Sequence, residues 1–496
     1  MARSHLETQI GKFKLDDLLI LNATLSRELF LKGHAFEDVE VQVNRGTFTQ
    51  KVIQYLTGWG LSDLSYLAIM NSNNYRSTIP NRGDVILLNN LLGEYTNNLA
   101  QQRMEVLEKA DVKAHILFGL SQKQFWYQEI AGNRKLINNF LRYFILLDQI
   151  PSKYFPKRTQ PKSDLMRLTG FNIRDFSQLI LAVWAYVLTT SVVLRITVSK
   201  DLKEVIPLWT EDNTYKCIRV FTGDYEFYRK PWHANNPLFF KPIIETANNM
   251  FIVSNVFILA RKFYEGIYWL IREDYKAQNS QTFTNDFGDY YEKYIEEILT
   301  YYLQQHPFEK VKKGKGRQAD WLIHTKNYLL VIEQKSCLMT VALKEEYPSM
   351  PTLDKYLEKF AEAYMQIENT ASGLEEKGKK IVKLVLHFEK FYVAEAVLKE
   401  RVNKLCSGQV KDVSNYFLID TGVFEGLIQA LSEDENVFNK IVEKKIEYES
   451  RLPPGEGREF KHIINTYYKT RSIKYLDNYK HYFDRLFGDL KEECDR

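Results

Sequence analysis

The chain has 496 residues, too many for a single hydrophobic core, so we expect about two to four domains. Hydrophobic residues make up 45% of the chain and charged residues 26%, a composition that excludes wholesale disorder. The formal net charge of +4 excludes a polycation, so any nucleic-acid-binding surface must be a local patch.

The cysteines are widely spaced and form no CxxC pair: Cys217, Cys337, Cys406 and Cys494. This spacing argues against a disulfide framework and against a structural zinc site. The N-terminus lacks the apolar core of a signal peptide, so the chain is expected to be cytoplasmic. The uncharged stretch 176–194 could just span a bilayer by its length. Its polar residues favour a buried helix that runs into a strand at 191–197, and we expect no membrane contact.

The first 275 residues have a mostly helical pattern. Helices are expected over 15–31, 91–110, 122–147, 171–188 and 243–275, and short strands over 39–43 and 84–88. This part contains no P-loop, HExxH or GxSxG motif. We interpret residues 1–275 as a recognition, sensor or partner-binding region, because its own chemistry cannot be identified from the sequence.

An amphipathic helix begins near Phe287, after a polar linker at 276–285. Glu292 and Glu296 lie one turn apart beside its apolar stripe. Such glutamates are usually solvated, but Glu292 could instead reach the carboxylates that follow in the chain. A dense basic loop comes next, and it has two interpretations, a solubilising loop or a phosphate-binding one. Its basic residues are Lys310, Lys312, Lys313, Lys315 and Arg317.

A tight β-hairpin is predicted directly after this loop. Its strands are 319–325 and 328–335, and Lys326-Asn327 forms a two-residue turn in which Asn tolerates a positive φ. That turn places Asp320 opposite Glu333, and alternation places Lys335 on the same side of the sheet. Opposed like charges are destabilising unless a cation lies between them, and a divalent ion with oxygen ligands fits best.

Elements after the hairpin complete an α/β core. A helix over 355–370 carries Gln366, strands are expected over 380–393 and 416–419, and a helix over 423–431 follows. The fold class is therefore a mixed central sheet flanked by helices at 276–432. A large, mostly helical N-terminal region precedes it, and a helical C-terminal extension follows at 433–496. Aromatic and basic residues alternate in 461–487, which suits nucleic-acid stacking or packing on the body, and we favour packing.

Asp320, twelve intervening residues and then Glu333-x-Lys335 resemble the signature of the PD-(D/E)XK nuclease superfamily. The residue before the aspartate is Ala319 instead of proline. The pattern Gly288-x-x-Tyr291-Glu292 resembles the first helix of that superfamily, and Gln366 lies in the helix after the hairpin. The resemblance covers roughly residues 285–430.

The resemblance implies Mg²⁺- or Mn²⁺-dependent phosphodiester hydrolysis. Asp320, Glu333 and the Gln334 main-chain carbonyl would hold the metal, and Glu292 would bind or orient a second metal or its water. Lys335 would orient or deprotonate the attacking water, while Gln366 and the basic loop would position the nucleic-acid backbone.

Three functions compete at this stage. The first is a metal-dependent DNA endonuclease, by analogy an anti-phage defence or restriction effector. The second is an RNA-cleaving nuclease, and the third is a non-catalytic nucleic-acid-binding subunit that keeps the fold. We favour DNA over RNA as the partner, and a homo-oligomer or a partner subunit stays open.

Overall fold

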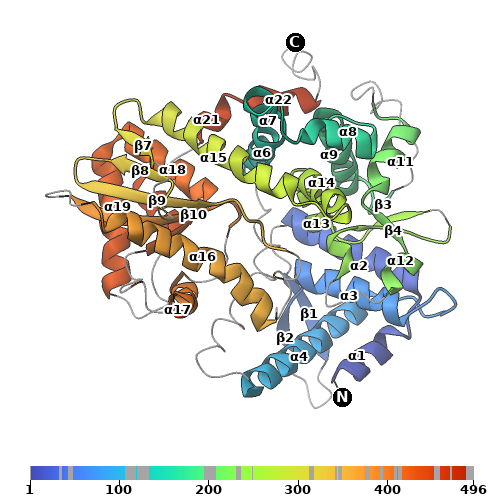
Figure 1. The fold of residues 1–496 in the computed structure, drawn as a ribbon. Coiled ribbons are helices and arrows are strands. Elements are labelled where there is room, and N and C mark those ends of the chain that lie inside the picture. Colours follow the sequence, from blue (N-terminus) through green and yellow to red (C-terminus); the bar gives the residue numbers. More distant parts are fainter. Residues whose placement is uncertain are drawn as a thin grey trace, which may run out of the picture.

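The computed structural model describes most of the chain. The described residues are 2–32, 36–42, 49–106, 119, 133–194, 208–230, 236–248, 250–311, 318–340, 343, 349–374, 379–390, 395–406, 410, 416–451, 459–469 and 472–487. The protein is a mixed α/β fold that is mostly helical (Figure 1). A helical N-terminal region, mixed sheets in the middle and a helical C-terminal segment confirm the predicted fold class.

Helices dominate the first 230 residues. They are α1 (Ala2–Ile10), α2 (Leu15–Lys32), α3 (Gly58–Asn71), α4 (Arg82–Val106), α6 (Asn133–Phe144), the π-helix η1 (Ile145–Gln149), α7 (Ile150–Tyr154), α8 (Pro161–Thr169), α9 (Ile173–Thr189), α11 (Glu211–Arg219) and α12 (Tyr225–Arg229). The helices predicted over 15–31 and 171–188 are confirmed as α2 and α9. Residues 107–110 and 122–132 of two other predicted helices lie outside the described residues.

Two predictions for the N-terminal region are wrong. The run 84–88, predicted as a strand, is helical in α4. The Asn81 amide donates a 2.8 Å hydrogen bond to the Asp84 carboxylate, and the Asp84 amide donates a 3.2 Å bond to the Asn81 side chain. This reciprocal pair stabilises the start of the helix. Range 243–275 is not one helix but two strands followed by two helices: β5 (Ile243–Glu245), β6 (Phe251–Val253), α13 (Val256–Lys262) and α14 (Gly266–Ala277). Asn255 begins α13, because its side chain accepts hydrogen bonds from the Phe257 and Ile258 amides.

Small sheets accompany these helices. Strands β1 (Phe36–Gln42) and β2 (Thr49–Tyr55) pair antiparallel, and β1 overlaps the predicted strand at 39–43. A four-stranded sheet has the order β3–β6–β5–β4, where β3 is Val193–Leu194 and β4 is Thr222–Asp224. Among the described residues no helix is long and apolar enough to cross a membrane.

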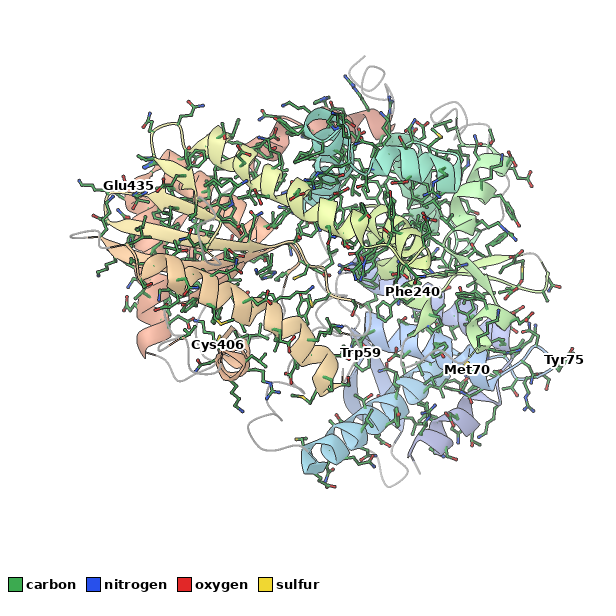
Figure 2. All side chains as sticks on the ribbon, in the orientation of Figure 1. Trp59, Met70, Tyr75, Phe240, Cys406 and Glu435 are labelled. Atoms are coloured by element: carbon green, nitrogen blue, oxygen red, sulfur yellow. The ribbon has the colours of Figure 1, made fainter. Side chains whose placement is uncertain are left out.

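The central sheet has five strands in the order β11–β10–β9–β8–β7. They are β7 (Phe308–Lys310), β8 (Trp321–His324), β9 (Tyr328–Lys335), β10 (Lys380–His387) and β11 (Tyr416–Asp420). Strands β9, β10 and β11 run parallel, whereas β7–β8 and β8–β9 are antiparallel. At the tip of the hairpin, the Lys326 amide donates a 2.5 Å hydrogen bond to Glu435, which begins helix α19 (Figure 2).

Helices cover both faces of this sheet. Side chains of β8 and β9 at Trp321, Leu330 and Ile332 belong to a core shared with α15 (Thr282–Tyr302), α18 (Thr421–Glu433) and α19 (Glu435–Arg451). Leu322 and Val331 point to a second core with α16 (Met350–Ala371) and α17 (Glu395–Leu405). Strand β7 and helix α17 were not predicted from the sequence.

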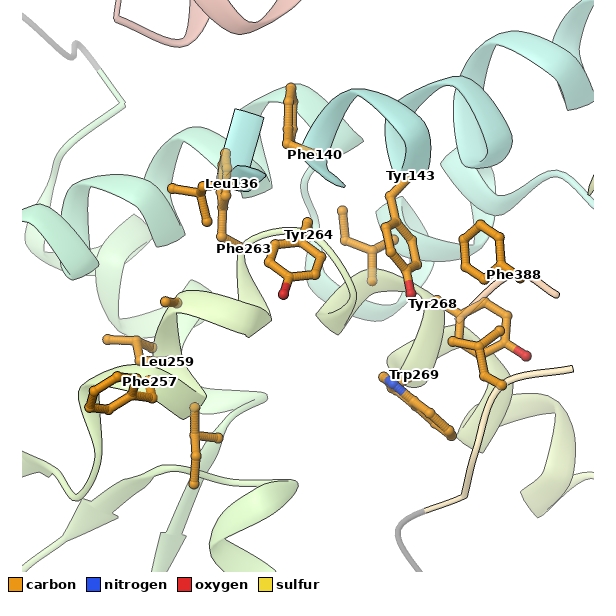
Figure 3. Packing of buried hydrophobic residues seen from close by; sticks show 14 of the residues in the cluster. Leu136, Phe140, Tyr143, Phe257, Leu259, Phe263, Tyr264, Tyr268, Trp269 and Phe388 are labelled. Atoms are coloured by element: carbon orange, nitrogen blue, oxygen red, sulfur yellow. The ribbon is translucent and has the colours of Figure 1, made fainter. Parts of the chain in front are cut away.

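One continuous hydrophobic cluster joins the distant parts of the chain. It contains buried residues from Leu6 to Leu486 and so includes helices of the N-terminal region, one face of the central sheet and the C-terminal segment. Figure 3 shows the middle of this cluster, where α6, α13 and α14 meet Phe388 just beyond β10. The rings of Phe140 and Phe263 stack there with centroids 4.8 Å apart. The domain boundaries near 275 and 432 stay predictions.

The C-terminal segment is built from short helices that pack on the body. They are α20 (Phe460–Tyr467), α21 (Lys474–Asp477), α22 (Lys480–Asp484) and the 3₁₀ turn η4 (Arg485–Phe487). Tyr475 is only 4% exposed, and its hydroxyl donates a 2.8 Å hydrogen bond to Glu297 of α15. The packing that we favoured for this aromatic segment is the one observed.

A buried histidine at the end of β10 predicts a specific pH dependence of stability. Burial lowers the pKa of His387 to about 4, although Asp420 and the Glu389 backbone oppose this effect. Between about pH 6.5 and 4 the unfolded chain holds a proton on this ring that the folded chain lacks, so stability falls as the pH falls. Urea unfolding at pH 7 and pH 4 measures this effect. Between these pH values, the free energy of unfolding should fall by about 3 kcal/mol more in wild type than in His387→Gln. Parallel stability–pH curves for the two proteins would contradict this assignment.

Candidate active site

The predicted hairpin register is the one observed. Trp321 pairs with Ile332 and His324 with Leu329, and the Thr325 amide donates a 2.9 Å hydrogen bond to the Tyr328 carbonyl. The paired residues end at Trp321 and Ile332, and Asp320 lies just outside β8, where its amide donates a 3.0 Å hydrogen bond to the Ile332 carbonyl. Asp320 is therefore not the register partner of Glu333, but the two carboxyl groups still interact with each other. Both carboxylates therefore lie at the same end of the hairpin.

Hydrogen bonds hold each side chain of this site in place. Asp320 Oδ2 accepts a 2.9 Å bond from the Gln334 amide. Lys335 Nζ donates to Glu333 Oε1 at 2.8 Å and to Gln366 Oε1 at 2.9 Å. Gln366 lies on α16, and its Nε2 donates in turn to the Gln318 carbonyl at 3.3 Å. The lysine is thus fixed between one carboxylate of the sheet and one amide of the covering helix.

Burial makes the two carboxylates costly to ionise together. Glu333 is 3% exposed. Burial raises the pKa of Glu333 to about 8, and the neighbouring Asp320 charge adds to this rise. Burial also raises the pKa of Asp320, against the opposing hydrogen bond from the Gln334 amide. A cation between the two groups would stabilise both ionised forms.

One oxygen of Glu333 accepts no hydrogen bond within the part of the chain that the structure describes, although the carboxyl groups of Glu333 and Asp320 also interact with each other, which adds to the rise that burial causes in the pKa of Glu333. Glu333 Oε2 is buried and accepts no hydrogen bond from any of the described residues. Buried polar atoms in folded proteins are nearly always paired with protein, water or an ion. The orphaned oxygen, next to Asp320 and the main chain of Gln334, therefore fits a hard cation with oxygen ligands.

The ligand set is small. Among the described residues, no group of three or more His, Cys, Asp and Glu side chains lies close enough to hold a metal ion. The protein's own ligands would accordingly be Asp320, Glu333 and the Gln334 carbonyl. Mg²⁺ commonly keeps several waters and takes only one or two carboxylates, so this donor set suits it.

Glu292 is bound elsewhere than to the carboxylate pair. It lies on α15 and forms an ion pair with Lys310 of β7. Its charge still acts on the site, since it contributes to the raised pKa of Asp320. Glu292 therefore acts on Asp320 through its charge while its ion-pair partner is Lys310, and its predicted direct approach to the hairpin carboxylates stays a prediction. Its predicted role toward a second metal or its water stays a prediction.

Lys310 is the only member of the predicted basic loop within the described residues. It is about half exposed and lies over the Trp321 ring, with Nζ 5.9 Å from the ring centroid. Lys312, Lys313, Lys315 and Arg317 lie outside the described residues. Their predicted role in phosphate binding stays a prediction.

Thr370 is a supporting residue that the sequence analysis missed. Its hydroxyl accepts a 2.8 Å hydrogen bond from the Ala319 amide, next to Asp320, and donates to the Gln366 carbonyl at 3.0 Å. Thr370 lies four residues after Gln366, so both are on the same face of α16. That spacing is the signal that could have identified it.

Comparison of the chain with protein-family models, with curated proteins and with solved structures gives no match. The functional argument therefore depends on the chemistry of the chain's own residues.

Proposed function

We propose that the protein is a metal-dependent endonuclease that hydrolyses phosphodiester bonds of DNA. The observation that carries this proposal is the pair Asp320 and Glu333, whose carboxyl groups interact at the end of a hairpin, with Lys335 bonded to Glu333. A buried, unpaired carboxylate oxygen beside a fixed lysine is costly for stability, and such arrangements are typical of functional sites.

The order of elements supports the same proposal. Helix α15 precedes the β8–β9 hairpin, and helix α16 and the parallel strands β10 and β11 come after it, with α17 between the two strands. These elements span the range 285–430 over which the chain resembles the PD-(D/E)XK superfamily. Gln366 of α16 accepts a hydrogen bond from Lys335, so it belongs to the same site, and its predicted contact with the nucleic-acid backbone stays a prediction.

The residues suit hydrolysis of a phosphodiester. Held by Asp320, Glu333 and the Gln334 carbonyl, Mg²⁺ or Mn²⁺ would supply Lewis-acid stabilisation and a more acidic water. The Lys335 ammonium would orient the attacking water and offset the negative charge that develops on the phosphate oxygens. Gln366 would keep the ammonium in this position. Water oxygen bonds to phosphorus, the bond to the leaving oxygen breaks, and that oxygen takes up a proton.

A substrate panel tests the proposal. Purified full-length protein is incubated with supercoiled plasmid, linear duplex DNA and single-stranded RNA, each with Mg²⁺ or with EDTA. We expect cleavage of DNA, including internal cuts in the closed circular plasmid, that requires Mg²⁺. Thermal unfolding with and without Mn²⁺ is measured in parallel, and the melting temperature should rise in wild type but not in Asp320→Asn, because a bound ion stabilises the folded state.

The outcomes separate the competing functions. Cleavage of RNA but not of DNA would show that RNA is the substrate. No cleavage of any nucleic acid, together with no effect of Mn²⁺ on the melting temperature, would favour a non-catalytic nucleic-acid-binding subunit.

A further inference from the structure

A cavity lies beyond the carboxyl ends of β10 and β11. Its volume is about 310 Å³, at the lower end of the range typical of small-molecule sites. Its walls come from segments distant in sequence: α6, the α13–α14 junction, the residues after β10, the start of α18, α20 and residues 472–473. In open α/β sheets, the crevice beyond the carboxyl ends of the strands is the usual place for a ligand.

The cavity is distinct from the proposed active site. Asp320, Glu333 and Lys335 are not among the residues that line it. The two sites adjoin, since the amide of the lining residue Phe388 donates a 3.0 Å hydrogen bond to the Lys335 carbonyl.

The charge of the lining favours an anion. Five basic side chains line the cavity, against three acidic ones. The basic residues are Lys135, Arg142, Arg261, Lys390 and Lys461. Two of the basic side chains are already paired with carboxylates, Arg142 with Glu425 and Arg261 with Glu265, so the three lysines carry the excess of positive charge. Each acidic side chain of the lining has a structural role. Glu265 accepts from Arg261 at 2.7 and 3.0 Å, Glu389 accepts from the Met339 amide at 2.7 Å, and Asp420 caps α18 through the Val423 amide at 2.9 Å.

The start of α18 adds to this positive field. Thr421, Gly422 and Val423 line the cavity at the N-terminus of this 13-residue helix. The helix dipole favours negative charge there, although Asp420 occupies part of that position. Gly422 lets a guanidinium approach the helix start, because a Cβ at this position would lie 3.2 Å from Arg142 Nη2. Guanidinium and ammonium groups beside helix amides are a favourable setting for phosphate.

Aromatic rings and amides line the rest of the cavity. Tyr143 meets Phe388 edge to face, with ring centroids 5.4 Å apart, and Tyr264 at 5.8 Å (Figure 3). The side-chain amides of Asn138, Asn139 and Asn465 also line the cavity. Aromatic side chains and hydrogen-bonding amides in one cavity suit a heteroaromatic base, whereas the basic side chains suit a phosphate ester.

We propose that this cavity binds a nucleotide, with its phosphate toward the basic residues and helix α18 and its base toward the tyrosines. The ligand class follows from the volume, the excess of basic side chains and the aromatic wall together. This inference stands apart from the proposed endonuclease activity, because it concerns different residues and needs no metal.

Isothermal titration calorimetry of the full-length protein in EDTA tests the site. The probes are AMP, GMP, CMP and UMP, with inorganic phosphate and adenosine as the two halves of a nucleotide. We expect one nucleotide to bind with a stoichiometry near one, and each half to bind more weakly. Lys461→Ala and Lys135→Ala should each weaken binding by about tenfold, the effect of losing one charged hydrogen bond.

Lys216→Ala is the matched control. Lys216 is an exposed lysine of α11 that does not line the cavity, so its variant should bind like wild type. Lys135 and Lys461 are at least partly exposed, so their variants are expected to fold, which thermal unfolding verifies. Binding that is unchanged in both cavity variants, or no binding of any of the four mononucleotides, would overturn the proposal.

Discussion

Lys335→Ala is expected to lower the rate of Mg²⁺-dependent DNA cleavage by about 10²- to 10⁴-fold. This is the range lost when a positioned proton-transfer or charge-stabilising group is removed from an active site. Lys335 has one ammonium, bonded to Glu333 at 2.8 Å and to Gln366 at 2.9 Å, and the alanine side chain cannot replace either contact. The measurement is single-turnover cleavage of plasmid at saturating protein.

Lys326→Ala is the matched control for this variant. Lys326 is an exposed lysine at the tip of the same hairpin, and its structural contact to Glu435 uses the main-chain amide, which alanine keeps. Its cleavage rate should stay within about twofold of wild type, since surface substitutions away from the site have small effects. Cleavage that persists undiminished in Lys335→Ala would show that the active site is assigned wrongly.

A second variant guards against a loss of fold. Lys335→Ala leaves Glu333 without its ammonium partner in a buried place, and this could destabilise the sheet. Lys335→Gln keeps a hydrogen-bond donor toward Glu333 but carries no charge. We expect it to unfold near the wild-type temperature and still to lose cleavage, which separates chemistry from stability.

Gln366→Ala should have a smaller effect than Lys335→Ala, about tenfold on the cleavage rate. Gln366 positions Lys335 and does not supply a charge, so its removal loosens the ammonium without removing it. Gln366→Glu offers an acceptor for Lys335 again and should recover part of the rate. Equal loss in Gln366→Ala and Gln366→Glu would argue against the positioning role.

Glu425→Ala is expected to cost about 3–5 kcal/mol of folding free energy, the effect of breaking a buried ion pair on one side. Glu425 is fully buried, and its two oxygens accept bonds of 2.7 and 2.6 Å from Arg142 of α6. It also accepts a 2.6 Å bond from the Tyr294 hydroxyl of α15. Although burial opposes ionisation of Arg142, the Glu425 carboxylate raises the pKa of this guanidinium. The alanine variant would leave the cation without this carboxylate, although Asn139 Oδ1 still accepts a 2.8 Å hydrogen bond from its Nη1.

Urea unfolding measures this effect, with Asp212→Ala as the control. Asp212 pairs with Lys216 at 2.8 Å on an exposed turn of α11, so its removal should cost less than about 1 kcal/mol. The double variant Arg142→Leu/Glu425→Leu should recover much of the loss, because apolar residues of similar size often replace a buried pair without penalty. If Glu425→Ala lowers the free energy of unfolding no more than Asp212→Ala does, the Arg142–Glu425 pair does not stabilise the contact between the N-terminal region and α18.

The sequence alone determined the local geometry of the candidate site. The two-residue turn at Lys326-Asn327 sets the hairpin register as far as the pair Trp321 and Ile332, so the turn brings Asp320 and Glu333 to the same end of the hairpin. Helices such as α2 and α9 could be predicted for a similar reason, since apolar spacing within one segment is a local property. Gln366 was identified as a site residue, and its bond to Lys335 agrees with that.

Only the tertiary structure decided which distant segments meet. Glu292 lies near the hairpin in sequence, yet its ion-pair partner is Lys310 on the edge strand. Range 243–275 has enough apolar residues for one helix, but β5 and β6 instead pair with each other in a buried sheet. Arg142 and Glu425 are 283 residues apart and still form a buried bidentate pair. Such contacts depend on burial and loop closure across the whole chain, which no local pattern encodes, whereas a turn and its opposed residues depend on only a few neighbouring dihedral angles.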